Sequence, residues 1–374
     1  MKGENLQKSK LSKNNDPRDI RGLSPKELQA YVSSKGFPTY RWKQIVQWLY
    51  GTSKTLPVIS FEEMKNLPKP LLETLQSNFQ IHFPNLVSLQ KDSHDGTTKF
   101  LLRLKDQETI ETVLIPETKK PGFLKPRSHR MTLCVSSQVG CAMGCTFCRT
   151  ATMGLKRHMT DAEILGQVLF VKRYLQEKRS EYSIRNIVFM GMGEPLHNYE
   201  NVKRAINWLV HQEGLNFSKR RITVSTSGLL PEMKRLLEDT GVRLAISLNA
   251  TTNSVRHQIM PINKKYDLES LLNLCRNLPV ARNERLTFEY VLLSGINDDP
   301  KDAKRLVKLL HGIKAKVNLL AFNEFDSSSF KRPSKDRLEV FRNILWKKGI
   351  QVNVRASRGR EILAACGQLR SQLQ

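Results

Sequence analysis

The stretch GCAMGCTFCRT, residues 140–150, carries three cysteines, Cys141, Cys145 and Cys148, separated by three and then by two residues. It follows TLCVSS, a β-rich run that begins at Thr132. Thiols so close together in sequence have poor geometry for disulfides with one another and good geometry for a metal centre. The sequence therefore predicts a strand that delivers a thiolate-rich loop to one end of a sheet.

From Thr132 onward, β-rich runs alternate with helix-like runs. A strand followed by a helix about six times predicts an α/β fold of parallel βαβ units, curved into an open barrel or laid out as a doubly wound sheet. In barrels of this kind the chemistry lies in loops at the C-terminal ends of the strands, and the cysteine loop falls there. The β-rich runs begin at residues 132, 186, 221, 243, 286, 316 and 351, and helix starts lie at Thr160 with Glu163 and after Tyr199, Pro231, Asp267, Pro300 and Pro333.

The region ahead of the barrel has two patterns. Ser24 followed by Pro25 is typical of a helix start, and Ser60 with Glu63 predicts a capping box for a further helix. Alternating residues over 86–115 predict an antiparallel meander, either a connector or an extension of the main sheet. We expect four parts: a disordered basic lead-in (1–22), a helical RNA-binding accessory domain (23–84), a β-meander connector (85–131) and the barrel core with a C-terminal loop (132–374).

Composition and charge restrict the class of protein. The chain has 374 residues with 39% hydrophobic residues, and no apolar run approaches the ~20 residues of a membrane-spanning helix. The N-terminus lacks the apolar segment of a secretory signal, so we expect a cytoplasmic protein with no membrane partner. Sixty-one Lys and Arg against 35 Asp and Glu leave a net charge of +26, which favours a nucleic-acid partner.

Two kinds of metal centre suit three clustered thiolates. Structural zinc uses four ligands, commonly two cysteine pairs, and no second pair is present here, although His158 or Cys134 would be able to complete a set. An iron–sulfur cubane with one iron left open fits three cysteines without a borrowed ligand. An open iron indicates a substrate site rather than a structural staple.

Seven further runs occur in a fixed order along the chain: SSQVGC, MGMGEPLHN, RITVSTSG, AISLNA, MPINKKY, FEYVLL and RGREILAACGQL. With the cysteine loop, they make the chain resemble the RlmN/Cfr family of radical S-adenosylmethionine RNA methyltransferases. The resemblance implies a partial (β/α)6 barrel with a small N-terminal helical domain and a short β extension. It also implies one [4Fe–4S] cluster on the three cysteines and contacts to S-adenosylmethionine from Gly193, Glu194, Ser225, Ser247, Leu248, Asn249 and Asn323.

The resemblance further implies a two-stage reaction that uses two molecules of S-adenosylmethionine per turnover. One methylates Cys366, and the second generates the radical that activates this methyl group for addition to adenine. Cys134 matches the thiol that resolves the resulting adduct by forming a disulfide, and Glu111 matches the proton acceptor. Without the resemblance, Glu111 reads as a solvent-facing strand residue, and Cys275 reads as a small buried hydrophobe.

The sequence leaves three alternative functions. The first is methylation of adenine C2 in 23S rRNA at the peptidyl-transferase centre and of the adenine 3′ to the anticodon in tRNAs, with a flavodoxin-like electron donor and a monomeric enzyme. The second is methylation of adenine C8 in 23S rRNA, as in the Cfr branch. The third is a non-enzymatic RNA-binding module, which would have no need of Cys134 and Cys366 beside a cluster.

Basic residues near the predicted site are expected to hold RNA phosphates. The segment 117–131 is longer and more basic than the family pattern, and Arg149 stands where a small residue is commoner. These features bear on the RNA repertoire and on the reach of Glu111. The basic residues are Lys119, Lys120, Lys125, Arg127, Arg130, Lys219, Arg220, Arg221, Arg355, Arg358 and Arg360.

Overall fold

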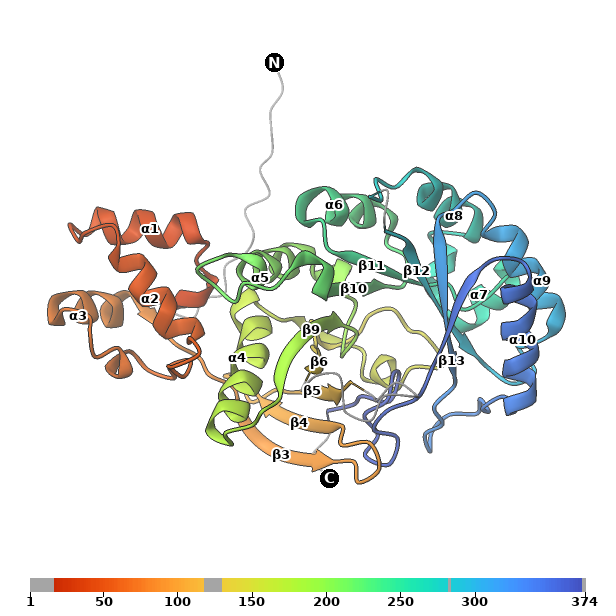
Figure 1. Cartoon of the computed structure of the whole chain (residues 1–374), viewed down its shortest axis with the longest axis horizontal. Helices are drawn as coiled ribbons and strands as arrows, with labels where there is room; N and C mark the ends of the chain where they lie inside the picture. Colours follow the sequence, from red (N-terminus) through yellow and green to blue (C-terminus); the bar gives the residue numbers. More distant parts are fainter. Residues whose placement is uncertain (1–16, 118–129, 282–283, 372–374) are drawn as a thin grey trace, which may run out of the picture.

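A computed structural model describes residues 17–117, 130–281 and 284–371. Three helices of the N-terminal region lie at one end of the molecule, beside a larger α/β body (Figure 1). Of the predicted lead-in 1–22, residues 1–16 lie outside the described ranges, as do the basic residues Lys119, Lys120, Lys125 and Arg127. The end of this segment is ordered, because Arg18–Asp19 form a short strand and Ile20–Gly22 form a buried 3-10 turn. Within those ranges no helix is long and apolar enough to cross a membrane.

The N-terminal helices are α1 (Pro25–Ser34), α2 (Arg41–Tyr50) and α3 (Lys69–Asn78). The predicted start at Ser24 is confirmed, because its side chain accepts a hydrogen bond from the Glu27 backbone within a capping box. The predicted start at Ser60 is wrong. Residues Phe61–Glu63 form only a short 3-10 turn, Ser60 caps nothing, and α3 begins after Pro68.

This helical region packs against the α/β body through α5 (Tyr199–Val210). The Tyr50 and Trp208 rings stack with centroids 4.8 Å apart, and Trp208 Nε1 donates to the Leu23 carbonyl at 2.7 Å. Both aromatic side chains are fully buried. The helices therefore share one hydrophobic core with the barrel.

A single ten-stranded sheet forms the body, in the order β14-β13-β12-β11-β10-β9-β6-β5-β4-β3. The meander β3 (Asn85–Lys91), β4 (Thr98–Arg103) and β5 (Thr109–Pro116) is antiparallel, as predicted. Because β5 pairs antiparallel with β6 (Arg130–Cys134), the meander extends the main sheet. The division of the chain into domains at the predicted boundaries stays a prediction.

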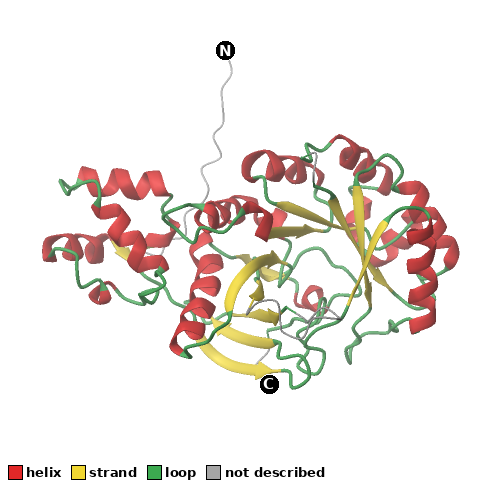
Figure 2. Ribbon diagram, viewed as in Figure 1, coloured by secondary structure: helices red, strands yellow, loops and turns green. Residues whose placement is uncertain are grey.

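The remaining strands are parallel and alternate with helices, as the sequence predicts. The helices cover the outer face of the curved sheet, so the barrel alternative is correct and the doubly wound alternative is wrong (Figure 2). The strands are β9 (Ser183–Phe189), β10 (Ile222–Thr226), β11 (Arg243–Ser247), β12 (Leu286–Leu292), β13 (Ala315–Ala321) and β14 (Gln351–Arg355). The helices are α4 (Asp161–Glu177), α6 (Leu230–Thr240), α7 (Asn253–Ile259), α8 (Leu268–Asn277), α9 (Pro300–Leu309) and α10 (Lys335–Lys347).

Strand β12 shows how the alternation assigns side chains to the two faces. Tyr290 is fully buried, and its ring lies 5.3 Å from the Phe341 ring of α10. Glu289 and Val291 point the other way, into a pocket at the barrel mouth. The inner face is therefore free to carry polar groups that the helix-facing core excludes.

Candidate active site at the barrel mouth

A pocket at the C-terminal ends of the parallel strands contains about 1000 Å³ of space free of atoms, part of it open to solvent. It brings together side chains from β9 to β14, the cysteine loop and the C-terminal loop, which no single segment of sequence contains. Among the predicted site residues, it is lined by Cys141, Cys145, Cys148, Gly193, Glu194, Ser225, Ser247, Asn249, Asn323 and Cys366. Leu248 is fully buried next to this lining and is not part of it.

The cysteine loop lies between β7 (Gln138–Gly140) and β8 (Leu155–His158), which pair antiparallel. Gly140 has φ +77°, and a Cβ there would lie 1.9 Å from the Gly154 carbonyl oxygen, so only glycine fits the close approach of the two strands. The Cys141 amide donates to that carbonyl at 2.8 Å. The hairpin thus fixes the loop at its base.

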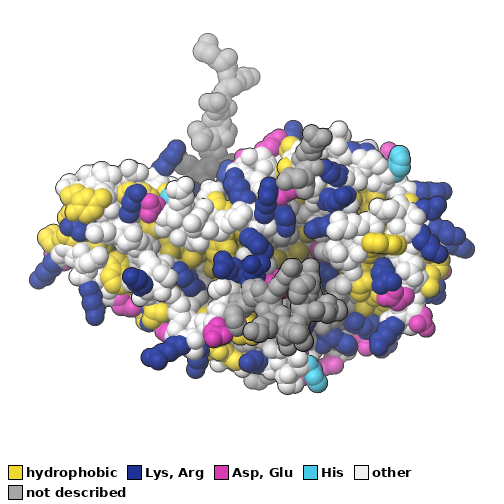
Figure 3. All heavy atoms as spheres, viewed as in Figure 1, with side chains coloured by type: hydrophobic (Ala, Val, Ile, Leu, Met, Phe, Trp, Pro, Cys, Tyr) yellow, Lys and Arg dark blue, Asp and Glu magenta, His cyan; other side chains and the backbone are white. Residues whose placement is uncertain are grey.

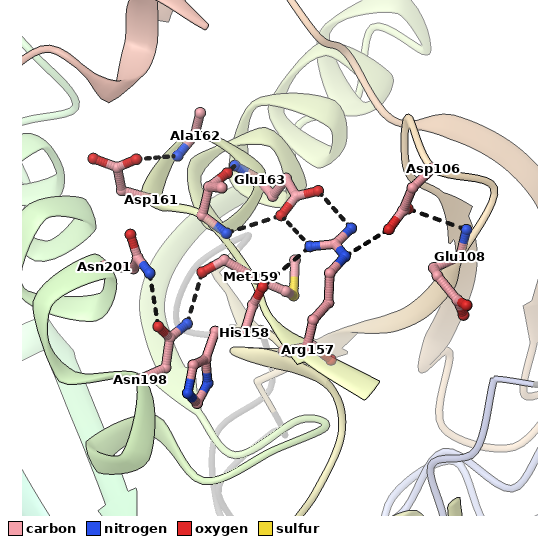
Figure 4. A network of polar contacts seen from close by, with 12 residues as sticks. Asp106, Glu108, Arg157, His158, Met159, Asp161, Ala162, Glu163, Asn198 and Asn201 are labelled. Atoms are coloured by element: carbon pink, nitrogen blue, oxygen red, sulfur yellow. Dashed lines mark hydrogen bonds and ion pairs between the residues drawn. The ribbon is translucent and has the colours of Figure 1, made fainter. Parts of the chain in front are cut away.

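A second set of contacts anchors the hairpin to the barrel (Figure 4). Arg157 donates two 2.8 Å hydrogen bonds to the Glu163 carboxylate in the first turn of α4 and a 2.6 Å bond to Asp106. Asn198 Nδ2 donates to the Met159 carbonyl at 2.7 Å. These residues hold the returning strand β8 between α4 and the β4–β5 turn. The sequence had indicated Glu163 only as part of a helix start and had predicted none of these contacts.

The three cysteines of the loop are free thiols in the pocket wall. Burial raises the pKa of each, that of Cys141 to about 12. No group of three His, Cys, Asp or Glu side chains in the described ranges is arranged to hold a single metal ion. Three cysteines of one loop in the wall of a pocket fit the ligands of a [4Fe–4S] cluster, which binds each thiolate to a different iron.

Glu194 connects the loops that follow β9 and β10. Its Oε2 accepts from the Ser227 amide at 2.7 Å and its Oε1 from the Leu196 amide at 3.1 Å. Desolvation raises the pKa of this buried carboxyl, and the two backbone donors oppose the rise. A cationic ammonium group in the pocket would offset the desolvation of the carboxylate. The Glu194 carboxylate therefore suits the amino end of S-adenosylmethionine.

Ser227 lines the same wall as Ser225 and contributes its amide to Glu194. Of the two, only Ser225 was predicted from the sequence. Both serines belong to the run RITVSTSG, and Ser227 directly follows β10, in the kind of loop where barrels of this type carry their chemistry. That position was the signal that would have identified Ser227.

The C-terminal loop reaches over the pocket and is fixed by hydrogen bonds. The Arg149 amide donates to the Gly367 carbonyl at 2.7 Å, and Thr150 Oγ1 donates to the Leu369 carbonyl at 2.6 Å. Asn323 Nδ2 donates to the Cys366 carbonyl at 3.2 Å. The loop is thereby joined both to the cysteine loop and to the end of β13.

Cys366 and Cys134 come together from opposite ends of the barrel sequence. Cys366 lies in the pocket wall, whereas Cys134 ends β6 and is 6% exposed behind it. Burial and, to a smaller extent, the neighbouring Cys366 thiol together raise the pKa of the Cys134 thiol to about 12. The two thiols are therefore close enough to interact electrostatically.

Glu111 lies outside this pocket. It is buried in β5, so the alternative of a solvent-facing residue is wrong. Its Oε1 lies 3.0 Å from Lys99 Nζ, and its Oε2 accepts from the Arg370 amide at 2.8 Å. Desolvation raises the pKa of the carboxyl while Lys99 opposes the rise. Glu111 lines an adjoining cavity with Arg149 and Arg370, directly beneath the C-terminal loop.

The predicted basic residues that lie within the described ranges do not form one surface. The turn Lys219–Arg221 precedes β10 and lies at the N-terminal edge of the sheet, away from the pocket. Arg358 is within 4.0 Å of the Asp95 carboxylate, and Arg355 lines the pocket itself. Figure 3 shows Lys and Arg side chains spread widely over the viewed face.

Comparison with known proteins gives a consistent result. Residues 135–307 match the radical SAM superfamily, and residues 18–81 match the ribosomal RNA large subunit methyltransferase N-terminal domain. A dual-specificity RNA methyltransferase RlmN of Geobacter sulfurreducens is 49% identical, with 95% of this chain and 92% of the relative covered.

Two further matches agree. The RlmN of Syntrophus aciditrophicus is 45% identical, with 94% of this chain and 96% of the relative covered. A crystal structure of a radical SAM methyltransferase from Sphaerobacter thermophilus is 40% identical with a TM-score of 0.85, covering 95% of this chain and 99% of that one. The chain accordingly belongs to the RlmN family of radical S-adenosylmethionine RNA methyltransferases.

Proposed function

We propose that this methyltransferase modifies C2 of an adenine in 23S rRNA at the peptidyl-transferase centre, and C2 of the adenine 3′ to the anticodon in tRNAs. The relatives named above carry the words "dual-specificity", which supports two RNA substrates. The observation that carries the proposal is that the Cys366 and Cys134 thiols lie close enough to interact electrostatically, and that Cys366 shares its pocket with three clustered cysteines. A simpler methyltransferase would not need two further thiols there.

The cofactors are assigned to the residues that fit them. Cys141, Cys145 and Cys148 would hold one [4Fe–4S] cluster, and Glu194 with the serine and asparagine side chains of the pocket would hold S-adenosylmethionine. When bound, these groups supply a methyl group and, in a second stage, a radical that abstracts hydrogen. The chain itself would hold the cluster and S-adenosylmethionine in a pocket whose lining is largely apolar.

Cys366 is assigned as the methyl carrier, because it alone among the noncluster cysteines lines the pocket in the described ranges. After carbon–carbon bond formation, protein and RNA are joined through the Cys366 sulfur. The Cys134 thiolate then attacks that sulfur, an S–S bond forms, and the S–C bond breaks. The carbon leaves with the electron pair of that bond and takes up a proton to become the methyl group.

Glu111 is assigned as the base that removes the proton from the modified carbon. The adduct formed by radical addition also carries one unpaired electron, which would pass to the bound cluster as this proton leaves. The position of Glu111 beneath the C-terminal loop supports this role, because Arg370 of that loop contacts its carboxylate directly. Lys99 keeps a positive charge at 3.0 Å and favours the ionised form that a base requires. The proposal also includes a cytoplasmic, monomeric enzyme supplied with electrons by a flavodoxin-like donor.

The test is product analysis with anaerobically reconstituted protein. Iron and sulfide should bind in equal amounts as a [4Fe–4S] cluster, and digested RNA should contain 2-methyladenosine by mass spectrometry. Stoichiometric zinc without charge-transfer absorbance would contradict the cluster assignment. Formation of 8-methyladenosine instead would contradict the C2 assignment and support the alternative at C8.

A further inference from the structure

Glu289 is a buried carboxylate that the proposed function leaves unused. It lies in the middle of β12, is 7% exposed, and lines the pocket. Its Oε1 accepts a hydrogen bond from Asn318 Nδ2 at 2.7 Å, whereas its Oε2 has no hydrogen-bond partner among the described residues. Because an unpaired buried carboxylate oxygen is unfavourable, its place in a ligand pocket indicates that a ligand supplies the missing donor.

A polar ladder across three strands fixes this carboxylate. Glu289, Asn318 and Asn353 are register partners on β12, β13 and β14. Asn353 Nδ2 donates to Asn318 Oδ1 at 3.2 Å, which turns the Asn318 amide nitrogen toward Glu289. The ladder therefore occupies Oε1 and leaves Oε2 available, so the acceptor is preorganised for a donor in the pocket.

Arg355 lies beside Glu289 at the same end of the pocket. Its Nη1 is 3.7 Å from Glu289 Oε1, and it follows Asn353 by two residues on the same face of β14. Its charge opposes the rise that burial causes in the pKa of the Cys366 thiol, so the guanidinium lies near the methyl carrier. A donor, an acceptor and the reacting sulfur thus share one region.

We propose that Glu289 and Arg355 read the Watson–Crick edge of the target adenine. Glu289 Oε2 accepts a hydrogen bond from the N6 amino group, and Arg355 donates to N1. This inference rests on the proposed function, since it needs a flipped adenine in the barrel mouth. It replaces the expectation that Arg355 holds a phosphate.

The chemistry of the bases explains why this pair would select adenine and C2. Adenine presents the N6 donor next to the N1 acceptor, and a carboxylate beside a guanidinium matches that order. Guanine presents an acceptor at O6 and a donor at N1, so the same pair would oppose both groups. C2 is bonded to N1 and therefore lies on the Arg355 side, near Cys366, whereas C8 belongs to the other ring.

S-adenosylmethionine is the other molecule that would offer a donor to Glu289. The polar side chains assigned to this cofactor come from the ends of β9, β10 and β11 and from Asn323. Glu289 and Arg355 come from β12 and β14, and both charges act on the Cys366 thiol. Asn323 follows β13, which lies between these two strands, so the strands alone do not divide the pocket. The pair is assigned to the RNA because both charges act on the methyl carrier, which the target base must reach.

The experiment compares two RNA hairpins that carry adenine or purine at the target position, with the cluster-loaded enzyme. Purine lacks the N6 amino group but keeps N1 and the C2 hydrogen. Wild-type protein should prefer adenine by about 10-fold or more in kcat/KM. Glu289→Met has similar length and no acceptor, and it should lose about 10-fold on adenine while treating the two hairpins alike.

Two additional variants control for general damage to the fold. Glu289→Gln keeps the size of the side chain, but its single carbonyl oxygen accepts from Asn318 and leaves an NH2 donor at the position of Oε2. Because this donor would face the N6 amino group, the preference for adenine should be lost as in Glu289→Met. Glu284→Met makes the same substitution just before β12, where the carboxylate pairs with Arg220 and Arg243 outside the pocket. It should keep the full preference for adenine.

Binding of the two hairpins without S-adenosylmethionine gives a readout that needs no turnover, and the preference should appear there as a ratio of Kd values. An unchanged preference in both Glu289 variants would overturn the inference. So would a loss of cofactor affinity with the preference intact, because the carboxylate would then belong to S-adenosylmethionine. If the wild-type protein made 8-methyladenosine, the proposed methylation at C2 would itself be wrong. Product analysis distinguishes that result from a failure of the inference about Glu289.

Discussion

The two ends of the pocket are built in different ways. At the first end, the cysteine loop, Glu194 and the serines come from the last residues of strands or from the loops that follow them, and each belongs to one short run of sequence. At the second end, Cys134 and Cys366 come from segments more than two hundred residues apart and meet only through the sheet and the C-terminal loop. Cofactor chemistry is thus encoded locally, whereas the RNA end depends on tertiary structure.

The largest effect expected at the first end follows Glu194→Ala. The change removes a charged acceptor and two hydrogen bonds to the Leu196 and Ser227 amides. Hydrogen bonds to charged groups contribute ~1.5–3 kcal/mol, so affinity for S-adenosylmethionine should fall by about 10- to 100-fold, measured by equilibrium binding to cluster-loaded protein.

The matched control for this change is Glu200→Ala, which removes a nearby carboxylate that pairs with Arg235 on the surface. It should leave the affinity for S-adenosylmethionine unchanged. Iron content should be normal in both variants, because neither residue is a proposed cluster ligand. Equal affinities for wild-type and Glu194→Ala protein would show that Glu194 is not part of the cofactor site. The first end of the pocket would then not be the cofactor end.

A smaller effect is expected at the second end from Gln368→Ala. Gln368 is buried, and its Nε2 donates to the Glu324 carbonyl at 2.8 Å, which holds the C-terminal loop over the pocket. The change also removes the 3.3 Å hydrogen bond that Gln368 Oε1 accepts from the Ala365 amide. At ~1 kcal/mol for each buried hydrogen bond, methylation of Cys366 should slow by about 5- to 30-fold, measured by mass spectrometry of the tryptic peptide.

Cofactor binding should change much less than methylation in Gln368→Ala, because Asn323 is the one proposed cofactor residue for which a hydrogen bond to the C-terminal loop is described. The exposed Gln351→Ala on β14 serves as the control and should methylate at the wild-type rate. An equal loss of cofactor affinity in Gln368→Ala would show that the two ends are not separable.

The same contrast explains what the sequence predicted about the fold. Thr160 and Glu163 predicted the start of α4 correctly because the chain continues into a long run with apolar residues on the core side. Ser60 and Glu63 show the same local pattern without a helix. Glu63 instead accepts from the Ile59 amide at 3.0 Å and pairs with Arg173 of α4 at 3.3 Å. Tertiary contacts there override the local signal.

The residues of the site also differ in whether the sequence could predict them. Spacing alone brought out the cysteine loop, and the family pattern brought out Cys134, Cys366 and Glu111. Glu289 stayed hidden, because one carboxylate within FEYVLL looks like an ordinary alternation on a half-buried strand. Its significance depends on the register with Asn318 and Asn353, which lie on two other strands of the sheet.

The most direct test of the central assignment is the fate of RNA in Cys134→Ala. If Cys134 resolves the adduct on Cys366, this variant should still accept the methyl group and join it to adenine, but it should not release the RNA. It should then purify covalently bound to RNA, seen as a nuclease-sensitive shift on a denaturing gel, and the further change Cys366→Ala should abolish the shift. Soluble, RNA-free Cys134→Ala protein with near-normal turnover would contradict the account, because a merely buried thiol loses only a modest volume on replacement by alanine.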